Sequence, residues 1–191
     1  GFALALAACL GFIAIQGGAS MLGRQRIEAA LQRLDPAARV LDVAMTAFPS
    51  HPLCWVFVSV ESDEGADRYR LRRGIFSLAP DALPAAQCPA ALVGGPEAAN
   101  ATPALALLTQ EQGGLSELRR LKSENCYFDA WLRFARAPLL HAGVATDLRF
   151  SSGPRGNFTT IDLAAFRQRA CPPHVPRWGF PRADLLIAPA R

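Results

Sequence analysis

The sequence predicts an α+β fold in which an N-terminal transmembrane helix precedes a small, mostly antiparallel β-sheet domain with two short helices. Three observations predict it: a long uncharged apolar start, several runs in which apolar and polar residues alternate, and a later stretch with helical spacing. We therefore divide the chain into four parts: a transmembrane helix at 1–22, a juxtamembrane amphipathic helix at 23–36, an α+β extramembrane domain at 37–165 and a Pro-rich C-terminal arm at 166–191.

The first 23 residues carry no charge and are dominated by Ala, Leu, Ile and Phe. About 20 helical residues span the hydrocarbon core of a bilayer, so the length suits one crossing. A secretory signal peptide would have a positive n-region, whereas this segment starts directly with apolar residues. A buried soluble helix would show a polar face, but only Gln16 and Ser20 are polar here. We expect this helix to contact the lipid bilayer and other transmembrane helices of a longer parent protein. The small residues Gly11, Gly17 and Gly18 would allow such helices to approach closely.

The chain begins at Gly1, inside apolar sequence and without an initiating Met. We therefore expect it to be the C-terminal piece of a longer protein. The part that precedes it could hold the active chemistry.

An amphipathic stretch follows the apolar segment. Ile27, Ala30, Leu31 and Leu34 recur at helical spacing with charged residues between them, and Pro36 ends the pattern. This apolar stripe could lie on the bilayer surface or pack against the following domain, and we favour domain packing.

Three alternating runs rich in Val, Phe, Trp and Tyr predict strands at 39–48, 53–61 and 68–78. The polar connection around Gly65 predicts a hairpin between the second and third strands. Arginines alternate with apolar residues in the third run, so we expect one of its faces to be solvated. The segment 80–104 is rich in Pro and Gly and is expected to be irregular.

Helical spacing resumes after residue 114. It predicts two short helices, with Ser116 as the cap of the first, a break near Asn125 and Pro138 as the stop of the second. Two further alternating runs, at 144–150 and 158–163, then predict a second hairpin. The Pro-rich tail shows no sustained period, so we expect an extended, partly ordered arm.

Composition excludes several classes of protein. A chain with 51% hydrophobic and 19% charged residues is not a disordered one, and 15 Gly and 15 Pro without a three-residue period exclude collagen. The net charge is +4, but the basic residues are scattered among acidic ones. No basic run reaches five residues, so we expect no nucleic-acid partner.

The five cysteines are Cys9 in the apolar segment and Cys54, Cys88, Cys126 and Cys171 beyond it. The last four could form two disulfides in an oxidising compartment, with three connectivities open. The alternative, which we prefer for Cys54, is a small buried residue in a strand. No C-x-x-C occurs, so a structural zinc site is not predicted.

The sequence holds three histidines, His51, His141 and His174, and none belongs to a metal-binding motif such as H-E-x-x-H. It also lacks a G-x-S-x-G elbow, a phosphate-binding P-loop and a dinucleotide-binding turn. We therefore assign no catalytic, cofactor-binding or metal-ligating residue and expect no cofactor in this chain.

One further candidate combines aromatic and arginine side chains from two strands and a helix. Its members are Pro49, Pro52, Trp55, Tyr69, the arginines of the third run (Arg68, Arg70, Arg72 and Arg73), Trp131, Arg133 and Arg136. They could form a groove for an anion or a partner, or a set of core aromatics with solvated arginines, and we favour the second interpretation.

Several short motifs follow one another along the chain. They are P-x-x-P-L-C-W at 49–55, D-R-Y-x-L-R-R-G-x-x-S-L-A-P at 67–80, Q-C-P at 87–89, E-N-C at 124–126, L-R-F-A-R-A-P at 132–138 and D-L-R-F at 147–150. With the preceding apolar helix, this series resembles the C-terminal region of the bacterial membrane-bound metal-dependent hydrolase family, that is, its last transmembrane helix and extramembrane domain. The resemblance covers roughly Gly1 to Leu163.

The resemblance implies a location in the cell inner membrane and a divalent metal in the part of the protein that precedes this chain. The family's metal ligands are expected in an N-terminal His-Arg-x-x-Thr/Ser-His-Ser cluster, which this sequence does not contain. No catalytic residue is therefore carried over. His51 stands where the family pattern has Asn in a Pro-x-Asn-Pro turn, so no role is assigned to that turn.

We expect a membrane-anchored C-terminal accessory or substrate-presenting domain of a metal-dependent hydrolase-like inner-membrane protein, without a catalytic centre of its own. The alternative is a membrane-anchored binding or scaffolding module with no hydrolase activity. The side of the membrane stays open: cysteines favour an oxidising compartment, whereas the positive-inside rule favours the cytoplasm through Arg24, Arg26, Arg33 and Arg39.

Overall fold

The computed structural model of the chain describes residues 1–48, 51–89, 100–150, 156–167, 169–171, 173–175 and 178–188. It begins with one long helix, α1 (Phe2–Leu34). A five-stranded sheet in the order β1-β2-β3-β5-β4 follows, built from β1 (Arg39–Phe48), β2 (His51–Asp63), β3 (Arg68–Ser77), β4 (Asn100–Ala101) and β5 (Leu105–Gly114). A short 3₁₀ helix, η1 (Ala85–Gln87), lies between β3 and β4.

The described residues from 115 to 188 form what we call the C-terminal lobe. Its sheet has the order β6-β7-β8, with β6 (Pro138–His141), β7 (Val144–Asp147) and β8 (Ile161–Asp162). Its helices are α2 (Leu115–Glu124), α3 (Cys126–Leu132), the 3₁₀ turn η3 (Leu148–Phe150), α4 (Leu163–Phe166) and α5 (Ala183–Leu186). All strand pairs in both sheets are antiparallel, which confirms the α+β prediction.

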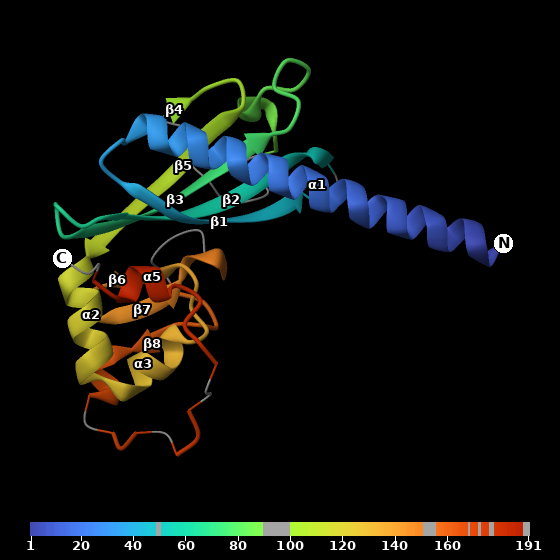
Figure 1. Cartoon of the computed structure of the whole chain (residues 1–191). Coiled ribbons are helices and arrows are strands. Elements are labelled where there is room, and N and C mark those ends of the chain that lie inside the picture. The colour runs from blue at the N-terminus through green and yellow to red at the C-terminus, as the bar shows by residue number, and fades with distance from the viewer. Residues whose placement is uncertain are drawn as a thin grey trace.

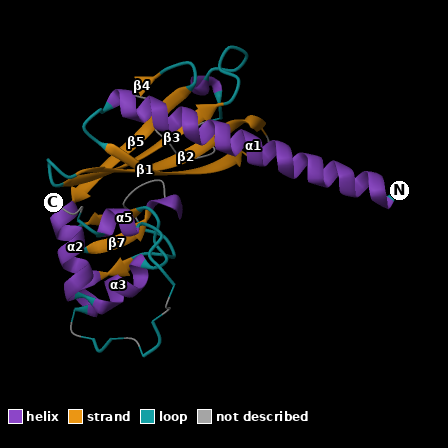
Figure 2. Ribbon diagram, in the orientation of Figure 1, coloured by secondary structure: helices purple, strands orange, loops and turns teal. Residues whose placement is uncertain are grey.

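The elements form three layers (Figures 1 and 2). The C-terminal half of α1 lies across one face of the five-stranded sheet, and the C-terminal lobe lies below the other face. The N-terminal half of α1 projects away from both (Figure 1). One helix therefore passes without a break from open surroundings into the packed body of the protein.

The change along α1 follows its sequence. Among its described residues, the buried ones are Gly23, Ile27 and Leu31, and the last two pack on the sheet with Val43 and Phe57. Residues three and four apart share one helix face, so this stripe fits a flat sheet surface. The expected packing of the juxtamembrane stripe on the domain is confirmed for Ile27 and Leu31, although Leu34 stays exposed.

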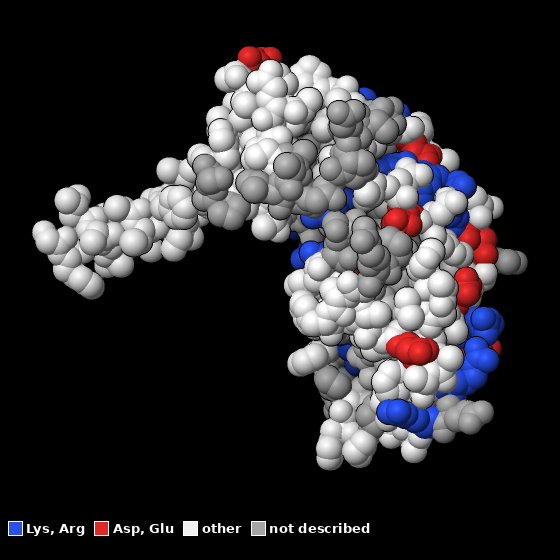
Figure 3. Space-filling model, turned by 180° about the vertical axis from the view of Figure 1, so that it is seen from behind, with Lys and Arg blue, Asp and Glu red and all other residues white. Residues whose placement is uncertain are grey.

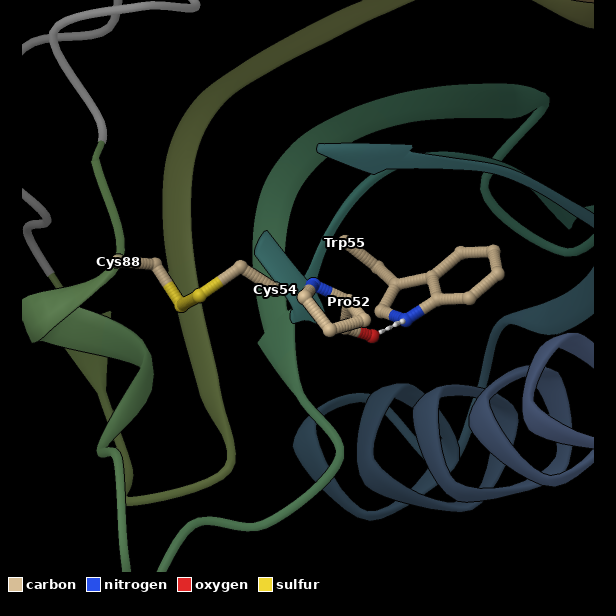
Figure 4. The surroundings of a disulfide bond; sticks show 4 residues. All are labelled: Pro52, Cys54, Trp55 and Cys88. Carbon is tan, nitrogen blue, oxygen red and sulfur yellow. Dashed lines mark hydrogen bonds between the residues drawn. A yellow bond between two sulfur atoms is a disulfide. The ribbon is translucent and has the colours of Figure 1, made fainter. Parts of the chain in front are cut away.

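Strand β2 contributes side chains to both faces of its sheet, because successive side chains of a strand point in opposite directions. Trp55 packs toward α1, while Cys54 points the other way and bonds to Cys88 (Figure 4). The indole Nε1 of Trp55 donates to the carbonyl of Pro52 at 3.1 Å. The disulfide joins positions 34 residues apart and ties the η1 segment to the sheet.

The expectation of a solvated face on β3 is wrong. Arg70 and Arg72 are buried, because the end of α1 covers this face. Arg70 forms an ion pair with Asp35, which follows the last turn of α1. Arg72 donates to Glu61 at 2.5 Å and to Gln110 at 2.8 Å, so both guanidinium groups find partners beneath the helix.

Strand β5 lies inside the sheet, between β3 and β4, although no strand was predicted at 105–114. Its second half is polar, and Gln110 there accepts a hydrogen bond from buried Arg72. At its end, Gly113 lets the backbone approach the ring of Tyr69, since a Cβ atom at this position would lie 2.6 Å from that ring. Within the predicted irregular segment, 80–104, the described residues hold only the short helix η1 and the two-residue strand β4, and residues 90–99 lie outside the described part of the chain.

The lobe confirms two helices with a break at Asn125, whose side chain accepts from the Phe128 amide. The predicted cap at Ser116 is wrong, because Ser116 lies within α2 and donates through its amide and hydroxyl to Asp67. The second hairpin is β7 and β8, with residues 151–155 of its connection outside the described residues. Pro138 begins β6 rather than ending α3.

The tail differs from the extended arm that we expected. Helix α5 lies within 166–191, and its Leu185 and Leu186 are buried in the core of the lobe. A disulfide between Cys171 and Cys126 joins the tail to the start of α3. Tail residues therefore help to form the core instead of only covering it.

Candidate functional site

A pocket of about 430 Å³ opens where α1, the edge strand β1 and the C-terminal lobe meet. Its polar lining is dominated by four arginines that come from four separate elements or their flanks. The full lining is Ser20, Arg24, Ala44, Met45, Thr46, Val56, Val58, Arg73, Arg136, Arg149 and Phe150. We call it the arginine pocket.

Each arginine reaches the pocket from a different place in the fold. Arg24 lies on α1, one turn after Ser20, and Arg73 lies on β3. Arg136 lies between α3 and β6, and Arg149 lies in η3. Figure 3 shows Lys and Arg atoms in the angle between the projecting helix and the rest of the molecule.

Buried Asp42 of β1 organises one side of the pocket. It forms a two-pronged ion pair with Arg136, in which the guanidinium donates from Nε to Oδ2 and from Nη2 to Oδ1, the latter at 2.7 Å. Arg182 and Arg24 approach the same carboxylate, at 3.7 and 3.9 Å. Asp42 therefore joins α1, the first sheet and two segments of the lobe, the α3–β6 connection and the residue before α5.

The pKa of Asp42 reflects two opposing effects. Burial raises it, but the hydrogen bond and charge of Arg136, together with the charges of Arg182 and Arg24, outweigh burial and hold the pKa below its usual value of 3.8. Asp42 is therefore ionised at neutral pH. The same contact raises the pKa of Arg136, whereas burial lowers the pKa of Arg73.

Asp147 plays the corresponding role on the lobe side. Its carboxylate is fully buried and accepts from Arg149 Nη2 at 2.7 Å and from the Arg136 amide at 3.0 Å. The side chains of Arg24, Arg136 and Arg149 stay 44%, 33% and 25% exposed. The carboxylates thus lie beneath the arginines, and positive charge faces the solvent.

An aromatic rim adjoins the pocket. Phe150, which lines it, stacks on Phe134 with ring centroids 6.0 Å apart and lies 4.9 Å from the ring of Phe158. All three rings are exposed, Phe158 to 79%. The guanidinium of Arg149 lies over both Phe134 and Phe150, at 5.5 and 4.9 Å from the ring centroids. Cationic and apolar surface therefore meet at one place.

A second groove, of about 820 Å³, lies between α1 and β5, on the other side of the helix's docked half. Its lining is mostly apolar: Arg26, Ala29, Ala30, Arg33, Leu34, Phe76, Pro80, Thr102, Pro103, Ala104 and Leu105. Its polar side chains are limited to Arg26, Arg33 and Thr102, whereas four arginines line the arginine pocket, which is therefore the better candidate site.

The aromatic and arginine cluster predicted from the sequence is divided by the fold. Trp55 packs beneath α1, whereas Tyr69 and Trp131 belong to the core on the opposite side of the sheet. Arg133 lies over the ring of Phe180, and its centroid distance is 4.5 Å. Of the predicted members, Arg73 and Arg136 reach the arginine pocket, and Pro49 lies outside the described residues.

The three histidines lie on separate elements. His51 begins β2, His141 ends β6 and is exposed, and His174 is exposed in the tail. Within the described ranges, no three His, Cys, Asp or Glu side chains gather into a group that could hold a metal ion. The expectation that metal chemistry lies outside this chain stays a prediction.

The cysteines form the disulfides Cys54–Cys88 and Cys126–Cys171, while Cys9 is free and exposed on α1. These pairs select one of the three open connectivities. The preferred interpretation of Cys54 as only a small buried residue is wrong, since it is both buried and bonded.

Sequence reasoning placed Arg73 and Arg136 in one candidate cluster but missed Arg24 and Arg149. These two come from distant segments, and no local pattern links them to the others. One signal could have found part of the site: the tripeptide Leu-Arg-Phe occurs twice, at 132–134 and 148–150, and the two phenylalanines stack.

No protein-family model, curated protein or solved structure matches the chain. The site is therefore interpreted from its own geometry.

Proposed function

We propose that the chain is a membrane-anchored accessory domain whose long first helix crosses a bilayer and holds two sheets beside its surface. The observation that carries this proposal is the change in burial along α1. An 18-residue apolar window has no buried residue, whereas Ile27 and Leu31 further along are fully buried. A helix with such an exposed apolar half needs an apolar environment, and its length suits a bilayer.

Membrane insertion is tested by a charge at the centre of the apolar half. Ile13→Arg places a guanidinium there, at a cost of about 3 kcal/mol for a bilayer-spanning helix. Ile187→Arg is the matched control, because Ile187 is about as exposed but lies in the tail. Alkaline extraction of membranes should release the Ile13→Arg protein and retain the wild type and the control. Release of the wild type would overturn the proposal.

We assign the domain to a metal-dependent hydrolase-like protein of the inner membrane, as an accessory or substrate-presenting module without its own catalytic centre. The support is the motif series from Pro49 to Phe150 and the absence from the sequence of the His-Arg-x-x-Thr/Ser-His-Ser cluster. The test measures bound metal and hydrolase activity in detergent, for the longer protein and for this chain alone. Metal and activity are expected only in the longer protein, and a metal held tightly by this chain would contradict the assignment.

A second candidate is a membrane-anchored binding module with no hydrolase attached, and the arginine pocket favours it. The sequence that precedes Gly1 distinguishes the two. Further apolar helices with the His-Arg-x-x-Thr/Ser-His-Ser cluster support the accessory domain, whereas a start codon directly upstream supports the binding module.

In this proposal, the disulfides indicate on which side of the membrane the two sheets lie. Two bonded pairs in one small domain are typical of an oxidising compartment, which favours the non-cytoplasmic side of the inner membrane. The arginines after the apolar segment would favour the cytoplasm under the positive-inside rule. At least two of them have structural contacts: Arg24 with Asp42, and Arg26 with the carbonyl of Leu78.

A further inference from the structure

We propose that the arginine pocket binds the phosphate-bearing headgroup of an anionic phospholipid at the surface of the bilayer. This inference rests on the proposed membrane crossing by α1. Three features of the pocket carry it: its depth relative to the apolar helix, its surplus of arginines and its aromatic rim.

The depth is fixed by α1 itself. Ser20 and Arg24 both line the pocket, and the uncharged segment ends at residue 23. Twenty residues at about 1.5 Å each span a hydrocarbon core of roughly 30 Å, and the headgroup layer adds several Å beyond it. The pocket therefore lies where lipid phosphates lie.

The charge suits a phosphate. Arg24, Arg136, Arg149 and Arg182 form ion pairs with three carboxylates, those of Asp42, Asp147 and Asp184, so guanidinium groups outnumber carboxylates in this network. Asp42 and Asp147 are buried, whereas the side chains of Arg24, Arg136 and Arg149 are partly exposed. Guanidinium groups bind phosphate oxygens in a two-pronged geometry, so fixed arginines form a suitable receptor.

The carboxylates also hold the arginines in place before a ligand arrives. Arg136 is fixed by Asp42, and Arg149 is fixed by Asp147 and by the rings of Phe134 and Phe150. Less side-chain freedom is then lost on binding. A volume of about 430 Å³ accommodates a glycerophosphate headgroup and lies in the range of small-molecule sites.

The aromatic rim distinguishes a lipid from a free anion. Phe134, Phe150 and Phe158 form an exposed apolar patch next to the cationic pocket. Such a patch is unfavourable in water and favourable at the boundary between headgroups and acyl chains. Because Phe150 lines the pocket together with Ser20, the patch faces the same depth of the bilayer.

Two variants on one helix turn test the site. Arg24→Gln removes a charge from the arginine pocket, and Arg26→Gln removes the same charge two residues later, where the side chain lines the apolar groove. The full chain is purified in a neutral detergent, and its affinity for dioleoyl phosphatidylglycerol and for dioleoyl phosphatidylcholine is measured by native mass spectrometry. Unfolding midpoints confirm that each variant is folded.

We expect the wild type to prefer phosphatidylglycerol, and Arg24→Gln to weaken its binding about fivefold to tenfold, the loss of about one net hydrogen bond. Arg26→Gln should leave the affinity unchanged. Equal loss in both variants would mean non-specific attraction, and equal binding of phosphatidylcholine would mean no recognition of the headgroup charge. Either result overturns the inference.

The source of the phosphate is tested by competition. Inorganic phosphate at millimolar concentration should displace little lipid, and Phe158→Ser should weaken lipid binding without changing the unfolding midpoint. Displacement by phosphate alone, with no effect of Phe158→Ser, would assign the pocket to a free anion and reject the lipid. Alkaline extraction reports separately on membrane insertion, so a failure of anchoring and a failure of lipid recognition give different results.

Discussion

Asp42 and Arg136 form an ion pair that joins the edge strand β1 to the C-terminal lobe across 94 residues of sequence. The carboxylate is 4% exposed and has three arginines around it. A buried charge that is paired on several sides is costly to remove, because its partners remain desolvated and without their counterion. This pair therefore links the stability of the two parts of the protein.

Asp42→Asn should lower the free energy of unfolding by about 2 to 3 kcal/mol, since it removes a buried charge but keeps the shape of the side chain. The measurement is denaturant unfolding of the full chain in detergent. Glu124→Gln is the control, because Glu124 pairs with Arg120 on an exposed face of α2. That change should cost about 0.5 kcal/mol or less. Similar losses in the two variants would contradict the central role of Asp42.

The packing of α1 on the sheet predicts that two leucines of this helix differ in their contribution to stability. Leu31 is fully buried on the sheet, whereas Leu34 is half-exposed. Leu31→Ala should destabilise the protein by about 3 kcal/mol through the cavity it leaves. Leu34→Ala should change stability by about 0.5 kcal/mol or less. Limited proteolysis between α1 and β1 should become faster only in Leu31→Ala, and equal rates would show that α1 does not depend on this contact.

The strands β1 to β3 and the break at Asn125 could be predicted from the sequence because their signals are local. Alternation, a polar hairpin and a capping residue act within a few positions. The burial of Arg70 could not be predicted in this way, because its partner Asp35 lies 35 residues away in the sequence. The helix that covers Arg70 was expected to pack on the domain only through its apolar stripe. Strand β5 was missed for a similar reason: its polar half is stabilised by Arg72 of the neighbouring strand.

The arginine pocket shows more clearly what could not be predicted from the sequence. Its four arginines come from α1, β3, the α3–β6 connection and η3, and the packing of α1 on the sheet places Arg24 near the others. The sequence placed Arg73 and Arg136 in a candidate anion groove, but with aromatic residues that the sheet separates onto opposite faces. Single-sequence patterns predict elements well and their junctions poorly, and this site is a junction.

The disulfides predict a count of reactive thiols. The chain has five cysteines, of which Cys9 alone is free. A polyethylene glycol maleimide should therefore add one label to the denatured, non-reduced protein and five after reduction. The replacement of both Cys54 and Cys88 by Ala should leave one label before reduction and three after it. Five labels without reduction would place the domain in a reducing compartment and contradict the proposed side of the membrane.

Glu61 predicts how stability depends on pH. Burial raises its pKa above the ordinary value of 4.5, and the hydroxyl of Ser59 and the charges of Arg72 and Arg70 only partly oppose this. The folded protein thus binds the Glu61 proton more tightly than the unfolded chain does. This contribution to stability is complete below pH 4.5 and is lost as the pH rises through the folded pKa.

Glu61→Gln removes that titration and keeps the shape of the side chain. Between pH 4.5 and pH 8, the wild type should therefore lose stability relative to the variant, as measured by denaturant unfolding at several pH values. Asp35, Asp42 and Asp67 have lowered pKa values and titrate below 3.8 in both proteins, so they cancel in the difference. A constant difference across this range would mean that Arg72 compensates the buried charge fully, and the polar contact beneath α1 would then stabilise the docked helix at every pH.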